Sequence, residues 1–143
     1  MDCKQFFRSI ENKRIAMCGI GISNTPMILR FLEQGARVLA CDRRNREAIG
    51  ELADRLEQAG AELRLGEDYL KNLEVDVIFR TPGMNFNLPE LLEARHNGIA
   101  VTSEMEVFFD LCPATILAVT GSDGKTTTTT LIAKMLEAAG KTV

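Results

Sequence analysis

The chain alternates between short apolar runs and longer segments in which apolar residues recur every three or four positions. The apolar runs have the length of strands, and the periodic segments have the spacing of one helix face. A few turn residues, often including glycine, separate one segment from the next. This alternation is typical of β-α-β units, which build a parallel sheet with helices on both faces. The sequence therefore predicts an α/β, Rossmann-like fold with five parallel strands.

The five strands and their helices are predicted to lie before about residue 110. The first strand is RIAMCGIG, and the helix after it begins near Ser23 or Asn24, has Pro26 in its first turn and ends at Gly35. The next elements are a strand RVLACD, a helix that carries Ile49, Leu52, Ala53, Leu56 and Ala59 and is closed by Gly60, and a strand AELRLG. After them come a helical turn or short helix over 67–73, a strand VDVIFRTPG running into a turn, a helix over 88–97 closed by Gly98, and a strand IAVTSE.

A second unit is predicted after a short amphipathic segment at 104–111. Pro113 precedes an apolar run, TILAVTG, which is interpreted as a sixth strand leading into SDGKTTTTT and an amphipathic helix. A strand, phosphate loop and helix in this order normally begin a domain of their own. We therefore predict one domain over 1–112 and the incomplete start of a second, truncated P-loop ATPase domain over 113–143.

Composition narrows the class of protein. Hydrophobic residues make up 45% of the chain and charged residues 26%, which excludes disordered and collagen-like chains. The formal charge of −3 gives no electrostatic footprint for nucleic acid or an anionic membrane, and no apolar run is long enough to cross a bilayer. The start of the chain lacks the features of a signal peptide, so a cytoplasmic protein is predicted. The four cysteines lie far apart, and Cys18 and Cys41 are interpreted as small buried side chains.

A glycine-containing loop between the sixth predicted strand and the last helix is the strongest chemical signal. Its glycines let backbone N–H groups face an anion, Lys125 can reach the β/γ-phosphates of a nucleotide, and the Thr126 hydroxyl can join a Mg²⁺ shell. Val119 stands where the common phosphate-loop spacing has glycine, so the loop is the shorter TGxxGKT variant. A glycine turn that begins a helix beside an exposed lysine is the alternative. The candidate ATP-binding residues are Gly121, Ser122, Asp123, Gly124, Lys125, Thr126 and Thr127.

The end of the first predicted strand carries part of a dinucleotide fingerprint. Gly19 and Gly21 have the required spacing, and Asp42 closes the second strand at about the expected distance. The third glycine of the fingerprint is replaced by Asn24, which weakens the case for NAD but leaves a pyrophosphate site at the helix start possible. A tight turn without a ligand is the alternative.

Charged and hydroxyl side chains also gather at this predicted sheet edge. Asp42 is followed by Arg43, Arg44 and Arg46, and Thr81 precedes Pro-Gly at the end of the fourth strand. An acceptor beside several cations suits the ribose or base of a nucleotide and its phosphates. A solvated run of charge and a plain Pro-Gly turn are the alternatives.

The segments GIGISNTP, FRTPGM, TSEMEVFF and VTGSDGKTTTTTLI, in this order and spacing, resemble the Mur ligases, and most closely their MurD family. The resemblance implies a three-domain enzyme whose first domain, here 1–112, holds the UDP part of a sugar nucleotide and whose second domain holds ATP. By position, Lys125 and Thr126 would be the catalytic residues of this segment, with Lys125 on the phosphates and Thr126 toward Mg²⁺. The residues that would bind the UDP substrate are Ile22, Ser23, Asp42, Arg43, Arg44 and Thr81.

The same resemblance implies a reaction in peptidoglycan precursor synthesis. ATP and Mg²⁺ would activate the carboxylate of UDP-N-acetylmuramoyl-L-alanine as an acyl phosphate, which the amine of D-glutamate attacks. The family's metal-binding acid, modified lysine and amino-acid domain would lie beyond Val143, so this chain is expected to bind UDP-sugar but not to ligate. The alternatives are an NAD- or nucleotide-binding sensor module, a small P-loop kinase, and another Mur or folylpolyglutamate-type ligase. An apolar surface on the second unit would favour either association of chains or packing on the first unit, and the sequence leaves the oligomeric state open.

Overall fold

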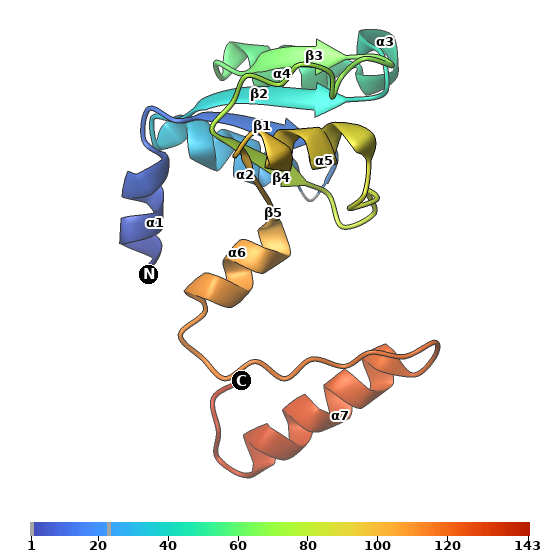
Figure 1. Ribbon diagram of the computed structural model, residues 1–143. Coiled ribbons are helices and arrows are strands. Elements are labelled where there is room, and N and C mark those ends of the chain that lie inside the picture. The colour runs from blue at the N-terminus through green and yellow to red at the C-terminus, as the bar shows by residue number, and fades with distance from the viewer. Residues whose placement is uncertain (1, 23) are drawn as a thin grey trace. The chain divides into compact units, whose positions relative to one another are not determined.

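The computed structural model describes residues 2–22 and 24–143. By its internal contacts the chain divides into two compact units, one ending at Leu111 and one spanning Cys112–Val143 (Figure 1). The two units are described separately.

The first unit is built on a parallel sheet. Its described residues form five strands, β1 (Arg14–Cys18), β2 (Arg37–Asp42), β3 (Glu62–Leu65), β4 (Val77–Arg80) and β5 (Ala100–Ser103). The strands lie in the order β3-β2-β1-β4-β5, and every neighbouring pair is parallel. The predicted five-stranded α/β fold is confirmed. The strand order reverses between β1 and β4, which is where open α/β sheets hold ligands.

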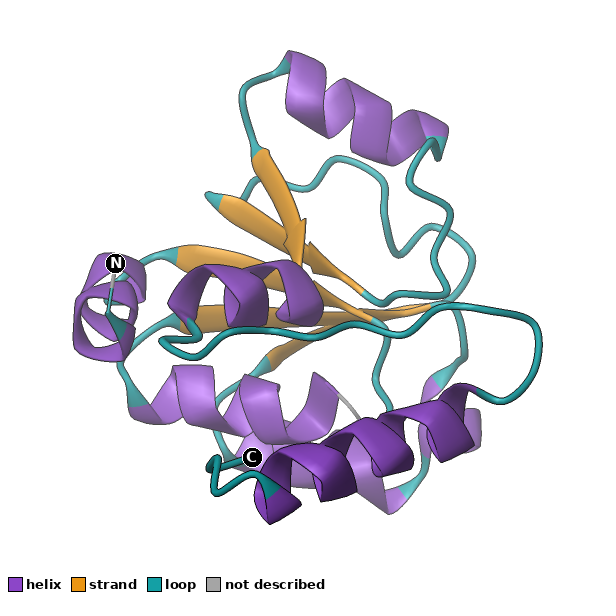
Figure 2. Cartoon of the chain, turned by 90° about the horizontal axis from the view of Figure 1, so that it is seen from below, coloured by secondary structure: helices purple, strands orange, loops and turns teal. Residues whose placement is uncertain are grey.

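Alternate residues of the central strands enter two hydrophobic cores, because successive side chains of a strand point to opposite faces. Ile15 and Met17 of β1 pack in one core with Ile28 and Phe31 of α2 (Asn24–Glu33). The alternate β1 residues, Ala16 and Cys18, pack in the other core, which also contains Leu91 and Ala94 of α5 (Pro89–His96) and Leu70 and Leu73. Helices therefore cover both faces of the sheet (Figure 2), which explains why the strand sequences are almost continuously apolar.

Helix α1 (Cys3–Ile10) was not predicted by the sequence pattern. Asp2 and Gln5 form a capping box, in which each side chain accepts a hydrogen bond from the other's backbone N–H. Phe6 and Phe7 pack against Phe31, with ring centroids 6.1 and 6.5 Å away. The helix thus adds aromatic side chains to the first core.

Two other segments of the first unit differ in detail from the prediction. The helix predicted before Gly60 is two helices, α3 (Arg46–Ile49) and α4 (Glu51–Gln58), because Gly50 has a φ of 65° and a ψ of −144°, outside the helical region. Residues 67–72 form consecutive turns, so of the two predicted alternatives, a helical turn and a short helix, no helix forms. The last element of the unit, α6 (Glu104–Leu111), occupies the predicted amphipathic segment.

The second unit contains α7 (Lys125–Ala138), as the sequence predicts, but no strand among its residues, all of which are described. The prediction of a strand over TILAVTG is therefore wrong for this structure. A strand exists through a ladder of hydrogen bonds to a neighbouring strand, and no such ladder forms here. High apolar content alone does not supply one.

Along the part of the chain that the structure describes, no helix combines the length and apolar character of a membrane-spanning segment.

Candidate functional site

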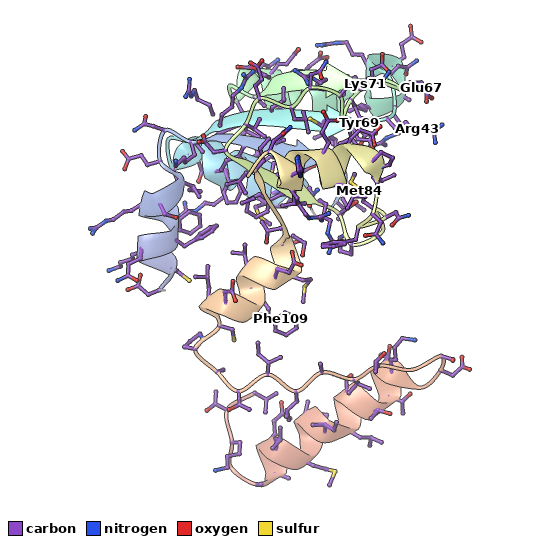
Figure 3. All side chains as sticks on the ribbon, viewed as in Figure 1. Arg43, Glu67, Tyr69, Lys71, Met84 and Phe109 are labelled. Atoms are coloured by element: carbon purple, nitrogen blue, oxygen red, sulfur yellow. The ribbon has the colours of Figure 1, made fainter. Side chains whose placement is uncertain are left out.

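A pocket of about 290 Å³ lies at the carboxyl ends of β1, β2 and β4. The register aligns these three ends, since Cys18 pairs with both Cys41 and Arg80. Figure 3 shows Arg43, Tyr69 and Met84 toward this end of the sheet. The lining residues are Gly19, Asp42, Arg43, Tyr69, Thr81, Gly83, Met84, Asn85 and Leu88. Three of the residues predicted to bind the UDP substrate, Asp42, Arg43 and Thr81, thus meet in one pocket.

Gly19 allows the ends of β1 and β4 to come together. Its φ is +99°, which side chains rarely tolerate, and a Cβ at this position would lie 2.5 Å from Cγ2 of Thr81. The Gly19 N–H donates to the carbonyl of Cys41 over 2.7 Å, which also ties it to β2. Thr81 is therefore held against the first turn of the fold.

Asp42 is a buried carboxylate whose acceptor sites are used within the protein. One oxygen accepts from the Ile20 N–H at 2.7 Å and from Arg44 Nη2 at 2.9 Å. The other accepts from the Arg44 N–H at 2.9 Å and from Arg44 Nε at 3.0 Å. The Arg44 guanidinium also donates to the Ile20 carbonyl. Asp42 thus joins the loop after β1 to the loop after β2.

These contacts shift the pKa values of both groups. Burial alone would raise the pKa of Asp42, but the hydrogen bonds from Arg44 and Ile20, with the positive charge of Arg44, lower it below its ordinary value. The hydrogen bond to Asp42 raises the pKa of Arg44. Asp42 is therefore an anion at neutral pH.

Asn24 occupies the place of the third fingerprint glycine, and its side chain is buried. Its amide nitrogen donates to the carbonyls of Cys18 at 3.2 Å and Gly19 at 2.9 Å. These carbonyls lie at the end of β1 and at the turn that follows it. Asn24 thus fixes the turn by hydrogen bonds, where glycine would allow close packing instead.

Two other residues predicted to bind UDP, Ile22 and Arg44, lie at a neighbouring hollow. Ile22 is 97% exposed, and with Arg44 it lines a second hollow, of about 510 Å³, between α2 and α4. Arg43 is exposed and pairs with Glu67, with Nε 3.3 Å from Oε1. Ser23 lies outside the described residues. Asp42 and Arg44 therefore stand between two hollows, one at the switch point and one against α2.

Sequence reasoning missed Tyr69, Met84, Asn85 and Leu88, which line the first pocket. Burial raises the pKa of Tyr69, and the neighbouring Cys18 and Asp42 act in the same direction. Tyr69 is the only tyrosine of the chain, but it lies in a turn segment with no recognisable motif. Met84 and Asn85 follow the Pro-Gly turn, and this position after the turn is the only feature of the sequence that could have indicated that they line the pocket.

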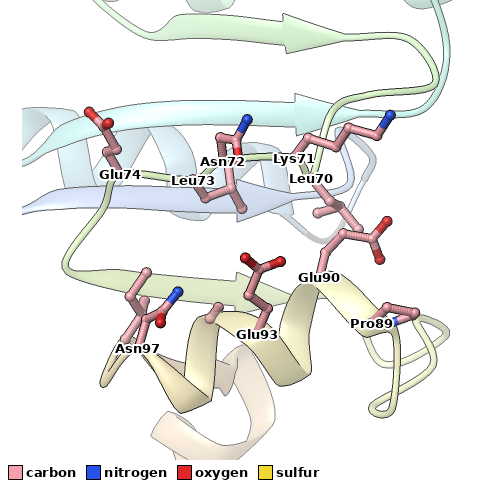
Figure 4. Close-up of a pocket in the computed structure, with 11 residues that line it drawn as sticks. Leu70, Lys71, Asn72, Leu73, Glu74, Pro89, Glu90, Glu93 and Asn97 are labelled. Atoms are coloured by element: carbon pink, nitrogen blue, oxygen red, sulfur yellow. The ribbon is translucent and has the colours of Figure 1, made fainter.

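A larger hollow, of about 560 Å³, lies between residues 70–74 and α5 (Figure 4). Glu90 and Glu93 of α5 face Leu70 and Asn72 across it (Figure 4). None of the residues predicted from the sequence to bind a ligand lines this hollow.

In the second unit, the predicted phosphate loop precedes α7 directly. Gly124 is the N-cap residue, with a φ of 74°, and no described side chain caps the helix, which leaves its first backbone N–H groups available to an anion. Lys125 Nζ donates to the carbonyls of Gly121 at 2.6 Å and Ser122 at 2.9 Å. The donor set of a phosphate site is thus present, with the lysine folded onto its own loop.

The run of threonines after Lys125 has a local structural role. The hydroxyls of Thr129 and Thr130 donate to the carbonyls of Lys125 and Thr126, four residues earlier, at 2.9 and 2.8 Å. Such bonds satisfy hydroxyls along a helix.

Known proteins with similar sequences are ligases. No model of a known protein family matches the chain. The chain is 50% identical over 136 residues to a UDP-N-acetylmuramoylalanine–D-glutamate ligase of Acetivibrio thermocellus, which covers 94% of the chain and 29% of that protein. It is 51% identical over 138 residues to the ligase of the same name from Ruminiclostridium cellulolyticum, covering 96% of the chain and 30% of that protein.

Two solved structures have a similar fold. One is the UDP-N-acetylmuramate-alanine ligase MurC of Thermotoga maritima, with a TM-score of 0.57 and 26% identity, covering 87% of this chain and 29% of that one. The other is the murein peptide ligase Mpl of Psychrobacter arcticus, with a TM-score of 0.58 and 26% identity, covering 90% of this chain and 27% of that one.

These relatives and the two solved structures are all Mur ligases, and the chain is similar to each of them over at least 87% of its own length. Its sequence matches the N-terminal region of the MurD ligases, the UDP-N-acetylmuramoylalanine–D-glutamate ligases, at about 50% identity. The chain spans about 30% of the length of the curated relatives that it matches.

Proposed function

We propose that the first unit binds the UDP part of UDP-N-acetylmuramoyl-L-alanine at the carboxyl edge of its sheet. The observation that carries this proposal is the pocket in which Asp42, Arg43 and Thr81 meet beside the glycine turn after β1. Relatives that are about 50% identical carry a UDP-sugar substrate in their names. Asp42 supplies an acceptor, the arginines supply cations, and the start of α2 supplies partial positive charge for a pyrophosphate.

The roles of the site residues follow from their positions. Thr81 offers a hydroxyl at the pocket wall, and Ile22 and Arg44 lie where they would cover one side of the uridine. Asp42 orients Arg44 and the Ile20 N–H, whose contacts with Asp42 are at most 3.0 Å. Ser23, at the start of the same helix, would contact the phosphates.

We further propose that the second unit supplies the ATP phosphate loop of a ligase that adds D-glutamate to this substrate. The uncapped start of α7 and the adjacent Lys125 fit a nucleotide polyphosphate. Bound ATP with Mg²⁺ would supply the phosphoryl group that turns the substrate carboxylate into an electrophile. The part of this chain would be to hold the phosphates, with Lys125 turned from its loop carbonyls toward them and Thr126 near the metal. Since the chain spans about 30% of its relatives, we expect the 143 residues to bind UDP-sugar without ligating.

Calorimetric titration tests the binding site. The 143-residue chain is titrated with UDP-N-acetylmuramoyl-L-alanine, UDP, NAD, and ATP with Mg²⁺. We expect saturable binding of the two UDP ligands and its loss in Asp42→Ala. Glu51→Ala, which removes an exposed carboxylate from α4, is the matched control and should bind as the parent does. Binding that Asp42→Ala leaves unchanged would refute this placement of the site.

A nucleotide-sensing module that binds NAD is the second candidate, and the Gly19-x-Gly21 turn is the observation that favours it. The buried Asn24 stands against it, because the dinucleotide fingerprint has glycine at this position for close packing of the helix on the strand, whereas Asn24 bonds to the carbonyls of Cys18 and Gly19. Saturable NAD binding in the same titration, with none for UDP, would decide for this alternative.

A further inference from the structure

The loop from Thr81 to Leu88 forms much of the wall of the carboxyl-edge pocket. Five of the nine lining residues come from it, and it contains neither helix nor strand. Its own hydrogen bonds are local: the Met84 N–H donates to Thr81 O at 3.0 Å, and the Asn87 N–H donates to the Asn85 side chain at 2.9 Å. These bonds shape the loop but do not attach it to the sheet.

Phe86, near the end of the loop, contacts two guanidinium groups that belong to β4 and α5. The Arg95 guanidinium carbon lies 3.6 Å from the ring centroid, and that of Arg80 lies 5.2 Å from it. Arg95 Nη1 also donates to the Phe86 carbonyl over 2.9 Å. The ring is 47% exposed, so burial alone does not hold it in place.

Both arginines are fixed to regular elements. Arg95 lies on α5, and Arg80 ends β4 with a side chain only 15% exposed. Arg80 Nη2 lies 3.6 Å from a carboxylate oxygen of Glu106 on α6. The loop is therefore attached through Phe86 to β4 and α5, and Arg80 in turn pairs with α6.

The contacts with Phe86 explain why two arginine nitrogens are buried without a hydrogen-bond partner. Arg80 Nε and Arg95 Nη2 have no hydrogen-bond partner among the described residues, although both are shielded from solvent. Unpaired buried N–H groups are costly, but a guanidinium beside an aromatic ring interacts with its electron-rich face. The Phe86 ring is the group that both side chains share.

We propose that Arg80, Phe86 and Arg95 form a clamp of positioning residues that holds the loop from Thr81 to Leu88 as the wall of the ligand pocket. The identity of the ligand, a UDP-sugar, rests on the proposed function, whereas the ordering of the loop does not. The clamp residues themselves do not line the pocket. They act on the ligand through Thr81, Met84 and Asn85.

Amide hydrogen exchange tests the clamp without any ligand. In Phe86→Leu and Arg95→Ala we expect the amides of residues 83–88 to exchange roughly 3- to 30-fold faster than in the parent chain, the range that corresponds to one cation–π contact. Phe109→Leu is the matched control, because Phe109 is 48% exposed and lies on α6 (Figure 3). Unchanged exchange in both clamp variants would overturn the proposal.

Ligand binding and rescue test the positioning role. Phe86→Leu should weaken UDP binding roughly 3- to 30-fold while the melting temperature stays near that of Phe109→Leu, and Phe86→Tyr, which keeps the ring, should restore both loop exchange and binding. Weakening no greater than in Phe109→Leu would overturn the positioning role. If the parent chain binds no UDP, the proposed function fails, and the exchange measurement still decides whether the clamp exists.

Discussion

Asp42 is the residue on which the candidate site depends most, because it joins two loops that carry ligand-binding candidates. Its carboxylate accepts four hydrogen bonds from Ile20 and Arg44. A ligand that hydrogen-bonds to Asp42 therefore has to replace part of the Arg44 interaction. Binding and the internal ion pair share the same acceptor sites.

The lowered pKa of Asp42 predicts how stability depends on pH. The carboxylate contributes stability above about pH 4, the ordinary pKa of aspartate, and this contribution is lost as the pH falls through the lower pKa of the folded state. Asp42→Asn should cost roughly 1–3 kcal/mol at neutral pH, because it disturbs a buried hydrogen-bonded group. Urea unfolding between pH 3 and pH 7 checks this, and the difference from the parent chain should narrow below pH 4. A difference that is constant with pH would contradict the assignment.

Gly19 and Thr81 form a second testable pair. Gly19→Ala should destabilise the chain by roughly 1–3 kcal/mol, because the positive φ disfavours alanine and the new Cβ would meet Cγ2 of Thr81. Thr81→Ser removes that methyl group, so the double variant should recover the part of the loss due to the clash. Denaturant unfolding of the four chains of this cycle gives the coupling free energy. Strict additivity would show that the two residues do not meet.

At the scale of elements, the residues at helix termini account for the helices that the apolar pattern did not predict. Helix α1 begins with the capping box of Asp2 and Gln5, a signal carried by two polar residues rather than by periodicity. Gly50 separates α3 from α4 although the apolar spacing continues through it. Backbone geometry at one residue therefore overrides the pattern on either side.

The cap of α1 gives a prediction of its own. Asp2→Ala should lower stability by roughly 0.5–2 kcal/mol, the usual cost of losing an N-cap side chain. Lys4→Ala on the same exposed stretch is the control and should change little. Thermal unfolding compares the two, and equal melting temperatures for both variants would mean that α1 does not contribute to the cooperative unit.

The strands and the pocket differ in how far sequence could predict them. The strands were predictable because a parallel strand buried on both faces must be a continuous apolar run. Gly19, Asp42 and Thr81 were predictable because they end such strands. Tyr69 and the Phe86 clamp were not, since their positions depend on how a turn segment and a loop fold back on the sheet. The prediction of a sixth strand was wrong for a related reason. Whether an apolar run forms a strand depends on a neighbouring strand to pair with, and the run itself carries no information about that neighbour.

At the scale of the whole molecule, the two units differ in how they are stabilised. The first unit has two buried cores, one on each face of its sheet. Between residues 112 and 143, all of which the structure describes, no residue is buried. Helix α7 therefore relies on its own hydrogen bonds, and isolated helices of this length are marginal in water.

This contrast predicts two classes of amide exchange. The amides of α7 should exchange at least about a hundredfold faster than those of β1, because local opening of α7 disrupts no core. Exchange followed by proteolysis and mass spectrometry separates the two segments. Comparable protection in α7 and β1 would show that α7 is part of the same cooperative unit.

Two buried cysteines in adjacent central strands make it possible to measure how often the sheet opens. Cys18 and Cys41 are neighbours in register and fully buried, and the hydrogen bond between them, with burial, raises the pKa of Cys18 well above its ordinary value. Cys3 is exposed and Cys112 is partly exposed. A thiol reagent should therefore modify two sulfurs quickly and two only when the central strands separate. Gly19 and Asp42, which line the pocket, directly follow these two cysteines in the sequence. A ligand bound in the pocket should therefore slow the modification of Cys18 and Cys41. The rate of the thiol reaction would then report how much of the pocket is occupied.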